Sequence, residues 1–281
     1  MIKAINIGNL KISLSSKPFV IAELGINHNG SVSLGKELIQ AAYENGADAI
    51  KFQTYITDER FENKDLKFIH FFKNMELSFD KEKTLWDYAK KFKKKIFSTP
   101  FDSKSFDFCI KNNVDAIKVA SFETTNNKLI NKLLKFKKTI FISTGQNKKN
   151  EIKKIYKKFE KNKNQICLMH CISSYPTLDK DANIYRLNNL SQISKYILGY
   201  SDHTLGHKSA TYAFTLGARF FEKHFTLNKN LKGPDHKMSI TPKELKLFKK
   251  KLLITREMLG DSKLYLLECE KFIHENVRRK S

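Results

Sequence analysis

Short runs of β-branched and aromatic residues alternate along the chain with longer, lysine-rich segments in which apolar residues recur at helical spacing. The runs predict strands at 19–25, 49–55, 96–102, 116–122, 139–145, 166–176, 197–203 and 219–227. The segments between them predict helices near 34–45, 81–94, 103–112, 126–136, 149–162, 187–196, 207–217 and 241–259. Such alternation is typical of an α/β protein with a parallel sheet.

The number of strand–helix units distinguishes two parallel architectures. About eight units in one chain of 281 residues favour a closed (β/α)8 TIM barrel. An open doubly wound sheet fits less well, because no glycine-rich dinucleotide-binding motif follows the first strand. Residues 2–14, with a turn at Gly8-Asn9, predict a small β-hairpin that covers one end of the barrel.

No linker rich in Pro, Gly or Ser divides the chain, so we expect one large domain with short additions at its ends. The hairpin occupies residues 1–16 and the barrel residues 17–260. Residues 261–281 form a C-terminal extension, a loop and a charged helix ending in Arg278-Arg279-Lys280-Ser281. The extension is too short for a further domain.

Composition excludes a disordered chain but leaves the role of its charge open. Hydrophobic residues make up 41% of the sequence, enough for a large core. Lys and Arg number 52 against 29 Asp and Glu, a formal charge of +23. This excess is consistent with the compositional bias of an AT-rich genome or with attraction of an anionic substrate or surface. We expect no nucleic-acid partner, because the lysines are dispersed and no nucleic-acid-binding module is present.

Two further features indicate the compartment. The N-terminal segment lacks the apolar core of a signal peptide, and no stretch approaches the roughly 18 apolar residues of a membrane span. We therefore expect a cytoplasmic protein without a membrane partner. Four cysteines are too few for a disulfide scaffold, so we expect reduced and mostly buried thiols at Cys109, Cys167, Cys171 and Cys269.

Polar residues gather at the predicted C-terminal ends of the strands, where a barrel of this kind carries its catalytic groups. They include Glu23, Lys51, Gln53, Ser98, Thr99, Lys118, Ser121, Glu123, Ser143, Thr144, His170, Ser173, Tyr175, Ser201, Asp202, His203, Glu222, Lys223 and His224. Side chains two positions apart on a strand point to the same face. This places three pairs on common faces: Lys51 with Gln53, Ser201 with His203, and Glu222 with His224. Burying so many charged groups without partners would be costly, so we expect them to point into one site.

His203 and His224 are the predicted metal ligands, because imidazoles on adjacent strands can converge on one cation. Two histidines leave an incomplete coordination shell, which water and substrate oxygens would complete. This suits a labile divalent ion, Mn²⁺ first and Mg²⁺ or Co²⁺ as alternatives, better than a structural zinc. The alternative is that both are core histidines bonded to carbonyl groups.

Two lysines and three hydroxyl groups predict an anion site of the kind that holds a phosphate. They are Lys51, Lys118, Thr99, Ser121 and Ser143. A lysine that forms a Schiff base, as in class I aldolases, remains an alternative, because the sequence does not indicate which lysine is desolvated.

Eight segments together resemble the motifs of the sialic acid synthase family, in order and at matching intervals. They are IAELGINHNG (21–30), GADAIKFQTY (46–55), FSTPFD (97–102), IKVASFE (117–123), ISTG (142–145), GYSDHTLG (199–206), EKHFTL (222–227) and GPDHKMS (233–239). The resemblance implies an enzyme that condenses phosphoenolpyruvate (PEP) with N-acetylmannosamine or a related 2-acetamido or 2,4-diacetamido sugar. The products would be a nine-carbon 2-keto-3-deoxy acid and phosphate.

Carried over residue by residue, the resemblance implies that His203 and His224 hold the divalent metal. The implied PEP site is formed by Lys51, Thr99, Lys118, Ser121, Ser143 and Ser201. The implied sugar site is formed by Glu23, Gln53, Tyr175 and Asp235. Glu23, Glu123 and Glu222 are the implied catalytic carboxylates. Ser173 is a further substrate contact, although the best-known members commonly have Asn at this position.

The sequence departs from the family in a second respect, at its C-terminus. Family members usually continue into an antifreeze-like domain that places an arginine on the sugar bound by the partner subunit of a dimer. That domain is absent from these residues, so it is a separate polypeptide, has been lost by truncation, or is dispensable. We expect a homodimer and consider a separate antifreeze-like domain protein a candidate partner.

Three residues at two places in the sequence indicate the branch of the family. Phe52 and Gly25-Ile26 resemble the neuraminate and legionaminate branch more than the pseudaminate branch. The alternatives are a pseudaminic acid synthase and a non-catalytic barrel that acts as a sugar-sensing subunit.

Overall fold

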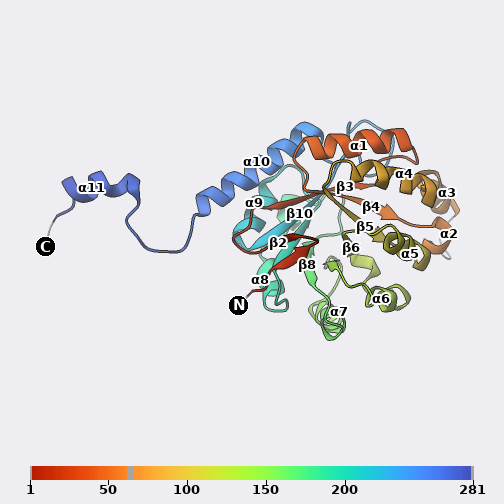
Figure 1. Ribbon diagram of the computed structural model, residues 1–281, viewed down its shortest axis with the longest axis horizontal. Helices are drawn as coiled ribbons and strands as arrows, with labels where there is room; N and C mark the ends of the chain where they lie inside the picture. Colours follow the sequence, from red (N-terminus) through yellow and green to blue (C-terminus); the bar gives the residue numbers. More distant parts are fainter. Residues whose placement is uncertain (1, 62–65, 280–281) are drawn as a thin grey trace.

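The computed structural model describes residues 2–61 and 66–279, and within them eight parallel strands close into a barrel (Figure 1). The strands are β3 (Phe19–Gly25), β4 (Ala49–Thr54), β5 (Lys95–Pro100), β6 (Ala116–Val119), β7 (Thr139–Ser143), β8 (Ile166–Cys171), β9 (Leu198–Asp202) and β10 (Ala218–His224). Each pairs with its neighbour in the chain, and β10 pairs with β3 to close the ring. The predicted (β/α)8 TIM barrel is confirmed.

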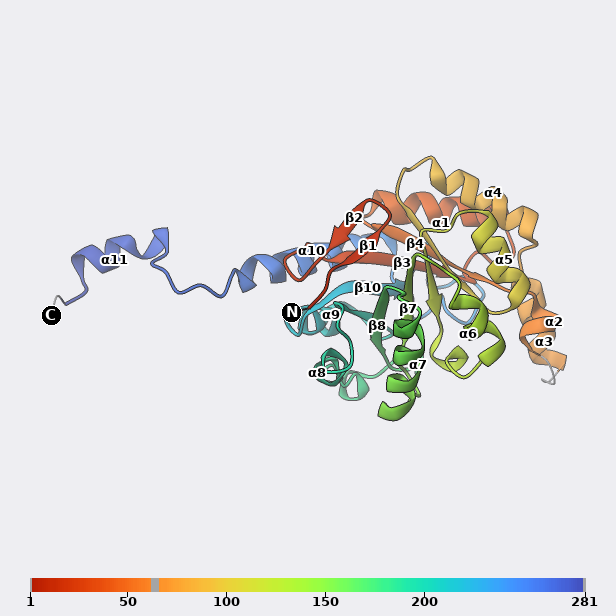
Figure 2. The same ribbon diagram turned by 60° about the horizontal axis from the view of Figure 1, so that its bottom comes forward.

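The predicted helices are present within a few residues of their expected bounds and surround the barrel (Figures 1 and 2). They are α1 (Val32–Glu44), α4 (Phe79–Lys90), α5 (Ser103–Lys111), α6 (Asn127–Leu133), α7 (Lys149–Lys161), α8 (Arg186–Ser191), α9 (Lys208–Thr215) and α10 (Pro242–Leu259). The sequence prediction missed α2 (Thr57–Arg60) and α3 (Leu66–Met75), which lie between β4 and α4. It also missed the short 3-10 helices η1 (Ser121–Glu123), η2 (Asp179–Asp181) and η3 (Glu268–Glu270).

Helix starts coincide with capping residues in the sequence. The Ser31 side chain accepts a hydrogen bond from the Leu34 amide at the start of α1, and Asp102 does the same for α5. At α10, Thr241 and Glu244 form a capping box. These local signals explain why the predicted and observed starts of α5 and α10 agree so closely.

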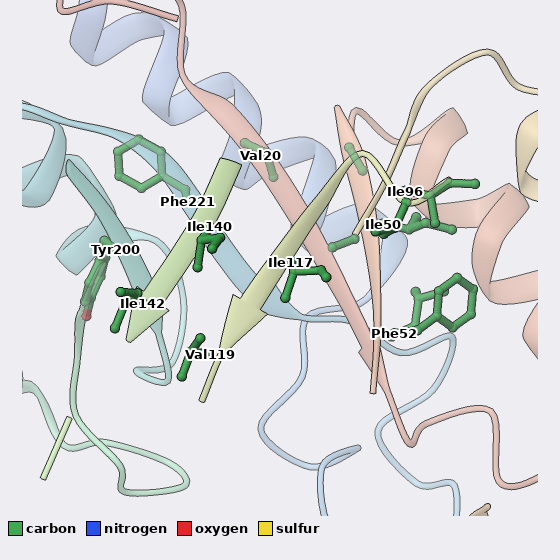
Figure 3. Close-up of a cluster of buried hydrophobic side chains, with 14 of the residues drawn as sticks. Val20, Ile50, Phe52, Ile96, Ile117, Val119, Ile140, Ile142, Tyr200 and Phe221 are labelled. Atoms are coloured by element: carbon green, nitrogen blue, oxygen red, sulfur yellow. The ribbon is translucent and has the colours of Figure 1, made fainter. Parts of the chain in front are cut away.

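The core has two layers because side chains alternate across each strand. Outward-pointing residues pack under the helices, and Figure 3 labels Val20, Ile50, Phe52, Ile96, Ile117, Val119, Ile140, Ile142, Tyr200 and Phe221. Inward-pointing aromatic rings fill the barrel near the N-terminal ends of the strands, where Phe141 lies 5.2 Å from Phe97 and 4.9 Å from Phe220 between ring centroids. This filling leaves space inside the barrel only toward the other end.

The predicted N-terminal hairpin is confirmed and covers the aromatic end of the barrel. Strands β1 (Ile5–Ile7) and β2 (Leu10–Ile12) pair antiparallel, and Gly8 turns between them with a φ of 60°. Ile5 and Ile7 are fully buried in the same cluster as the inner rings. The hairpin therefore closes the end opposite to the predicted site.

The C-terminal residues extend away from the barrel in both views (Figures 1 and 2). After α10 an irregular segment leads to η3 and to α11 (Lys271–Asn276), with apolar side chains such as Leu264 and Phe272 exposed to solvent. Of the predicted terminal run, Arg278 and Arg279 follow this helix, whereas Lys280 and Ser281 lie outside the described residues. Among the described helices, none is both long and apolar enough to cross a membrane.

Candidate active site

A cavity of about 500 Å³ opens at the C-terminal ends of the barrel strands and brings together most of the predicted site residues. Those that line it are Glu23, Lys51, Gln53, Thr99, Lys118, Ser121, Ser143, Tyr175, Ser201, His203, Glu222, His224 and Asp235. They come from all eight strand ends or the loops that follow them. Convergence of this kind is how a TIM barrel builds an active site.

The Glu222 carboxylate lies between two buried lysines at the base of the cavity. Its Oε1 is 2.5 Å from Lys118 Nζ, and its Oε2 is 3.8 Å from Lys51 Nζ. Ser201 Oγ bridges the closer pair, at 3.0 Å from Lys118 Nζ and 3.2 Å from Glu222 Oε1. Burial raises the pKa of Glu222, but the two ammonium groups outweigh burial and hold this pKa below its usual range. The carboxylate therefore remains ionised at neutral pH.

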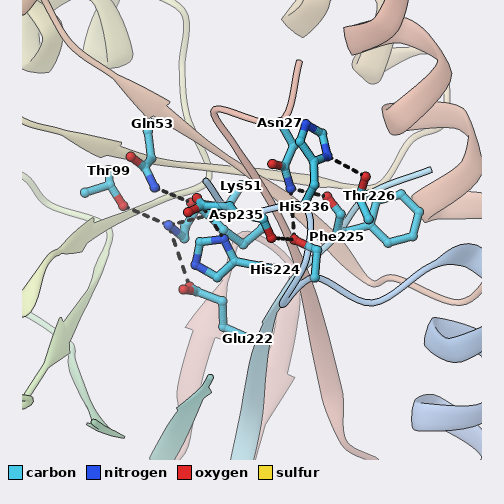
Figure 4. Close-up of polar contacts among 12 residues, drawn as sticks. Asn27, Lys51, Gln53, Thr99, Glu222, His224, Phe225, Thr226, Asp235 and His236 are labelled. Atoms are coloured by element: carbon cyan, nitrogen blue, oxygen red, sulfur yellow. Dashed lines mark hydrogen bonds and ion pairs between the residues drawn. The ribbon is translucent and has the colours of Figure 1, made fainter. Parts of the chain in front are cut away.

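Lys51 also contacts a second carboxylate and a hydroxyl group (Figure 4). Its Nζ is 2.7 Å from Glu23 Oε2 and donates to Thr99 Oγ1 at 2.9 Å. Gln53 Nε2 donates to Glu23 Oε1 at 3.1 Å, so both oxygens of that carboxylate are held in place. These contacts fix the orientation of the ammonium group from three sides.

Several buried hydroxyl groups near these lysines have no protein partner. The Oγ atoms of Ser121, Ser143 and Ser173 lack a hydrogen-bond partner among the residues described. A Cβ atom on Gly145 would lie 2.9 Å from Ser121 Oγ and 2.6 Å from Ser173 Oγ, so only glycine leaves these hydroxyls room. Buried polar groups are normally paired, so the free hydroxyls of Ser121 and Ser143, which line the cavity, indicate a polar ligand there.

Two imidazole rings form the adjacent wall of the cavity. The ring centroids of His203 and His224 are 5.5 Å apart. His203 Nδ1 donates to the Ile172 carbonyl at 2.7 Å, so in the neutral ring the lone pair is on Nε2. His224 Nδ1 lies 3.3 Å from Asp235 Oδ2. Burial lowers the pKa of His224, but the neighbouring carboxylates, Asp235 foremost, outweigh burial and raise it.

The donor set fits a divalent metal bound by two histidines. Within the described parts of the chain, no three His, Cys, Asp or Glu side chains form a metal-binding group. Two imidazoles would then supply only part of a coordination shell, and oxygen ligands from water and substrate would supply the rest. The carbonyl bond expected of a core histidine is present at His203, but it occupies one nitrogen only.

The loop that carries Asp235 is tied to the barrel by buried polar contacts, which Figure 4 also shows. Asn27 Nδ2 donates to the Phe225 carbonyl and to Ser239 Oγ, both at 2.9 Å. Thr226 Oγ1 and His236 Nδ1 are 2.7 Å apart. This network holds the loop after β10 over the cavity and so positions Asp235 beside His224.

Two predicted site residues do not line the cavity. Ser173 is not among the lining residues, and its Oγ lies beside Gly145. Glu123 ends η1, where its Oε2 accepts from Asn126 Nδ2 at 2.7 Å. Burial raises the pKa of Glu123. Glu123 lies in the 3-10 turn after β6, so strand alternation does not apply to it.

The expectation that every strand-end polar group points inward was also wrong for Ser98, Thr144, His170, Asp202 and Lys223, which do not line the cavity. His170 Nε2 bonds the Ala182 carbonyl at 2.8 Å, and its ring stacks on Tyr200 in the helix layer. Lys223 Nζ pairs with Asp202 Oδ2 at 2.8 Å, also among fully buried groups away from the cavity. Each alternates with an inward-pointing neighbour, which places it on the outer face of its strand.

Other lining residues were not predicted from the sequence. Cys171 lines the cavity and lies 3.9 Å from His203 Nδ1, whereas we expected only a buried thiol. Cys109 and Cys167 are buried as expected, and Cys269 is exposed. Arg60 and an apolar wall complete the lining, the wall consisting of Ile26, Phe61, Phe72, Phe101, Ala120, Phe122 and Pro234. Arg60 follows a strand end by six positions, too far for strand periodicity to place it.

Comparison with known proteins gives consistent matches. The NeuB family matches residues 38–264. An uncharacterized protein of Methanocaldococcus jannaschii is 40% identical over 276 residues, 98% of this chain and 82% of that protein. The N,N'-diacetyllegionaminic acid synthase of Campylobacter jejuni subsp. jejuni is 35% identical over 261 residues, 87% of this chain and 78% of the synthase.

A solved structure agrees over the full length. N-acetylneuraminic acid (sialic acid) synthetase from Leptospira borgpetersenii serovar Hardjo-bovis, in complex with citrate, matches with a TM-score of 0.93 and 32% identity. The match covers 100% of this chain and 99% of that one. The family match over most of the chain, together with these similarities, shows that the protein is an enzyme of the NeuB family, the sialic acid synthase family that its motifs resemble.

Proposed function

We propose that the enzyme condenses PEP with an N-acetylated amino sugar, releasing phosphate and a nine-carbon 2-keto-3-deoxy acid. The observation that carries this proposal is the juxtaposition in one cavity of three elements. These are the Lys51–Glu222–Lys118 centre, the unpaired serine hydroxyls and the two converging imidazoles. The first two suit an anionic donor, and the third suits a metal that activates a carbonyl group.

PEP binds at the lysine side of the cavity in this proposal. Lys51 and Lys118 supply the positive charge for its phosphate and carboxylate, and the hydroxyl groups supply neutral donors. The hydroxyls are those of Thr99, Ser121, Ser143 and Ser201. Glu222 supplies a countercharge to both lysines, and Lys118, which contacts Ser201 and Glu222, retains one N–H group for the ligand.

The sugar binds between this anion site and the mouth of the cavity. Glu23 and Gln53 are hydrogen-bonded to each other and line the same cavity as His224, and His224 in turn contacts Asp235. Tyr175 covers His203, with ring centroids 4.2 Å apart. A hydroxyl-rich substrate suits this set, because the carboxylates accept and the amide and phenol donate.

His203 and His224 would hold the metal, which we propose to be Mn²⁺. When bound, it supplies Lewis-acid polarisation of the aldehyde carbonyl of the open-chain sugar. Asp235 keeps His224 oriented, and the Ile172 carbonyl does the same for His203. Adding EDTA should abolish turnover, and Mn²⁺ should restore it.

The reaction balances with one added water. C3 of PEP forms a bond to the aldehyde carbon of the sugar, and water adds to the resulting cation at C2. The tetrahedral adduct then loses phosphate by C–O cleavage and becomes the 2-keto acid. We assign proton transfer to Glu23 and Glu222, which line the cavity, rather than to Glu123, which does not.

The test is an assay with Mn²⁺, PEP and either N-acetylmannosamine or a 2,4-diacetamido-trideoxy hexose. Release of phosphate with formation of a keto acid supports the proposal. Turnover with pyruvate as sole donor, trapped by borohydride, would identify a Schiff-base aldolase instead. Sugar binding without any turnover would identify a sugar-sensing subunit.

Product identity completes this proposal. Phe52 and Gly25-Ile26 favour a neuraminate-type or legionaminate-type product over pseudaminate. A panel of acylated sugars with mass detection of products would distinguish the three. We propose further that the enzyme works in the cytoplasm as a homodimer, which light scattering of the full chain tests. An antifreeze-like domain supplied in trans should lower the KM for sugar if it is a functional partner.

A further inference from the structure

Arg60 brings a guanidinium group to the apolar side of the active-site cavity. It ends α2 and lines the cavity together with Phe61, Phe72 and Phe101. The guanidinium carbon lies 3.5 Å from the ring centroid of Phe101 and 4.8 Å from those of Tyr55 and Phe61. A fourth ring, Phe72, is 5.2 Å away. The cation is therefore surrounded by aromatic faces, which attract it but accept no conventional hydrogen bonds.

Two of the three guanidinium nitrogens lack a hydrogen-bond acceptor among the residues that the structure describes. Arg60 Nε and Nη1 are shielded from solvent and have no partner there. No carboxylate forms an ion pair with Arg60 within that same set. Burial lowers the pKa of Arg60 to about 10, so the side chain is still protonated at neutral pH. Shielded guanidinium donors without acceptors are costly, which indicates that an acceptor arrives with a ligand.

A second buried arginine shows the arrangement expected of a purely structural role. Arg219 also stacks on a ring, with its guanidinium carbon 4.0 Å from the centroid of Phe214. Its Nε donates to the Leu14 carbonyl at 2.6 Å, and its Nη1 donates to the carbonyls of Phe214 and Ala218 at 3.0 and 2.8 Å. Arg219 is thus satisfied by backbone carbonyls, whereas Arg60 is not.

We propose that Arg60 and its aromatic surround form the subsite for an acylamido group of the sugar. The carbonyl oxygen of that group accepts from the unpaired N–H groups of Arg60, and its methyl group packs on the rings. The assignment rests on the proposed function, because it takes the sugar as the ligand of this cavity.

A neutral carbonyl oxygen fits this position better than a second phosphate. The Glu123 and Asp235 carboxylates already act on the charge of Arg60. The surrounding wall is apolar, whereas the neutral donors suited to a phosphate lie with Lys51 and Lys118. A phosphate dianion bound at Arg60 would be repelled by these two carboxylates and attracted by one cation, Arg60 itself.

The test combines substitutions at Arg60 with sugars that differ in whether they carry the acylamido group. Arg60→Met keeps the packing and removes the donors, and Arg60→Lys keeps the charge but not the planar fork. Arg219→Met is the matched control at the far end of the barrel. We expect Arg60→Met to raise the KM for N-acetylmannosamine about 10- to 100-fold and to leave the KM for PEP unchanged. Arg60→Lys should fall between the wild type and Arg60→Met.

Binding measurements decide the outcome even if turnover is lost. Calorimetry with N-acetylmannosamine and with mannose gives the preference for the acyl group. The wild type should show this preference, Arg60→Met should lose most of it, and Arg219→Met should retain it. An equal loss for both sugars, or a loss of thermal stability alone, would mean that Arg60 is structural. Arg60-dependent binding of the sugar 6-phosphate in preference to the free sugar would overturn the acyl assignment.

These results also separate the inference from the proposed function. If no sugar is converted with PEP but the acyl preference still depends on Arg60, the proposed reaction fails and the subsite stands. If conversion occurs and the preference is independent of Arg60, the reaction stands and the subsite fails.

Discussion

The Glu222 carboxylate neutralises two lysine ammonium groups that are themselves buried. Lys118 and Lys51 have few other counter-ions nearby, although Lys51 also contacts Glu23. Removing a buried countercharge is costly because the remaining charge stays desolvated. The same residue therefore affects both stability and the anion site.

The first prediction concerns this residue. Glu222→Gln keeps the shape of the side chain but leaves Lys118 without a carboxylate. We expect a loss of about 3 kcal/mol in the free energy of unfolding and at least about a 100-fold loss in kcat. The control is Asp87→Asn, which breaks exposed pairs with Lys83 and Lys90 and should cost less than about 1 kcal/mol. Equal effects of the two substitutions would contradict the assignment.

The second prediction concerns the histidines. His203→Ala or His224→Ala should lower the bound Mn²⁺ measured by elemental analysis and abolish metal-dependent turnover, while circular dichroism shows a folded barrel. His170→Ala is the matched control, since His170 is buried but points into the helix layer. It should destabilise the protein and leave the metal content unchanged. Unchanged metal content in both cavity variants would disprove the two-histidine site.

At the scale of elements, helix α4 is attached to the barrel by a buried carboxyl group. Glu82 Oε1 accepts from Thr54 Oγ1 at 2.5 Å and from Trp86 Nε1 at 3.2 Å. Burial raises the pKa of Glu82 to about 8, against smaller opposing effects of these hydrogen bonds. Glu82 is therefore protonated in the folded protein at neutral pH.

The third prediction follows from this pKa. In the unfolded chain the Glu82 carboxyl ionises near pH 4.3, so between about pH 4.3 and 8 unfolding releases a proton. The contribution of Glu82 to stability is thus complete below this window and is lost as the pH rises through it. Denaturant titrations at pH 5 and 7 give the free energy of unfolding of each protein. Between these two pH values, this free energy should fall by roughly 2–3 kcal/mol more in the wild type than in Glu82→Gln. Parallel pH profiles of the two proteins would refute a raised pKa.

The fourth prediction concerns the hairpin that covers the other end of the barrel. Ile5 is fully buried against the inner rings, whereas Leu10 on the same hairpin is exposed. Ile5→Ala should lower the free energy of unfolding by about 2–4 kcal/mol, and Leu10→Ala by less than about 0.5 kcal/mol. Neither should alter kcat/KM of the folded enzyme, because the cavity lies at the opposite end. A selective loss of activity in Ile5→Ala would show coupling between the two ends.

On the scale of the whole molecule, the positive charge is spread over the outer faces of the helices. Helix α7, for example, buries Ile152, Ile155, Tyr156 and Phe159 and turns its many lysines to solvent. Dispersed lysines raise the local concentration of anions but do not read a nucleic-acid sequence.

The fifth prediction is therefore weak, salt-sensitive binding to nucleic acids. Fluorescence anisotropy with duplex DNA and RNA should show affinity that falls steeply between about 50 and 200 mM salt and does not depend on sequence. Sub-micromolar, sequence-dependent binding at physiological salt would revive a nucleic-acid function. PEP affinity should decrease much less over the same range, because its binding groups are buried.

The sequence by itself determined the fold, because strand and helix periodicity and capping are local properties. The strands, one helix after each barrel strand and the hairpin were all predicted near their observed bounds, whereas α2 and α3 were missed. The side chains that line the cavity from regular strands, such as Lys51 and His224, were also predicted, since alternation along a strand assigns each to one face. Periodicity did not indicate that Glu123 lies outside the cavity, because alternation ends with the strand.

Only the tertiary structure decided which groups meet. Lys118 and Glu222 are 104 residues apart, and their contact exists because the barrel closes across its interior. Arg60 enters the cavity through a helical connection whose path depends on packing against Phe101 and Phe72. Periodicity describes the direction of a side chain relative to its own backbone. Distances between segments depend instead on how the elements pack, which no local pattern encodes.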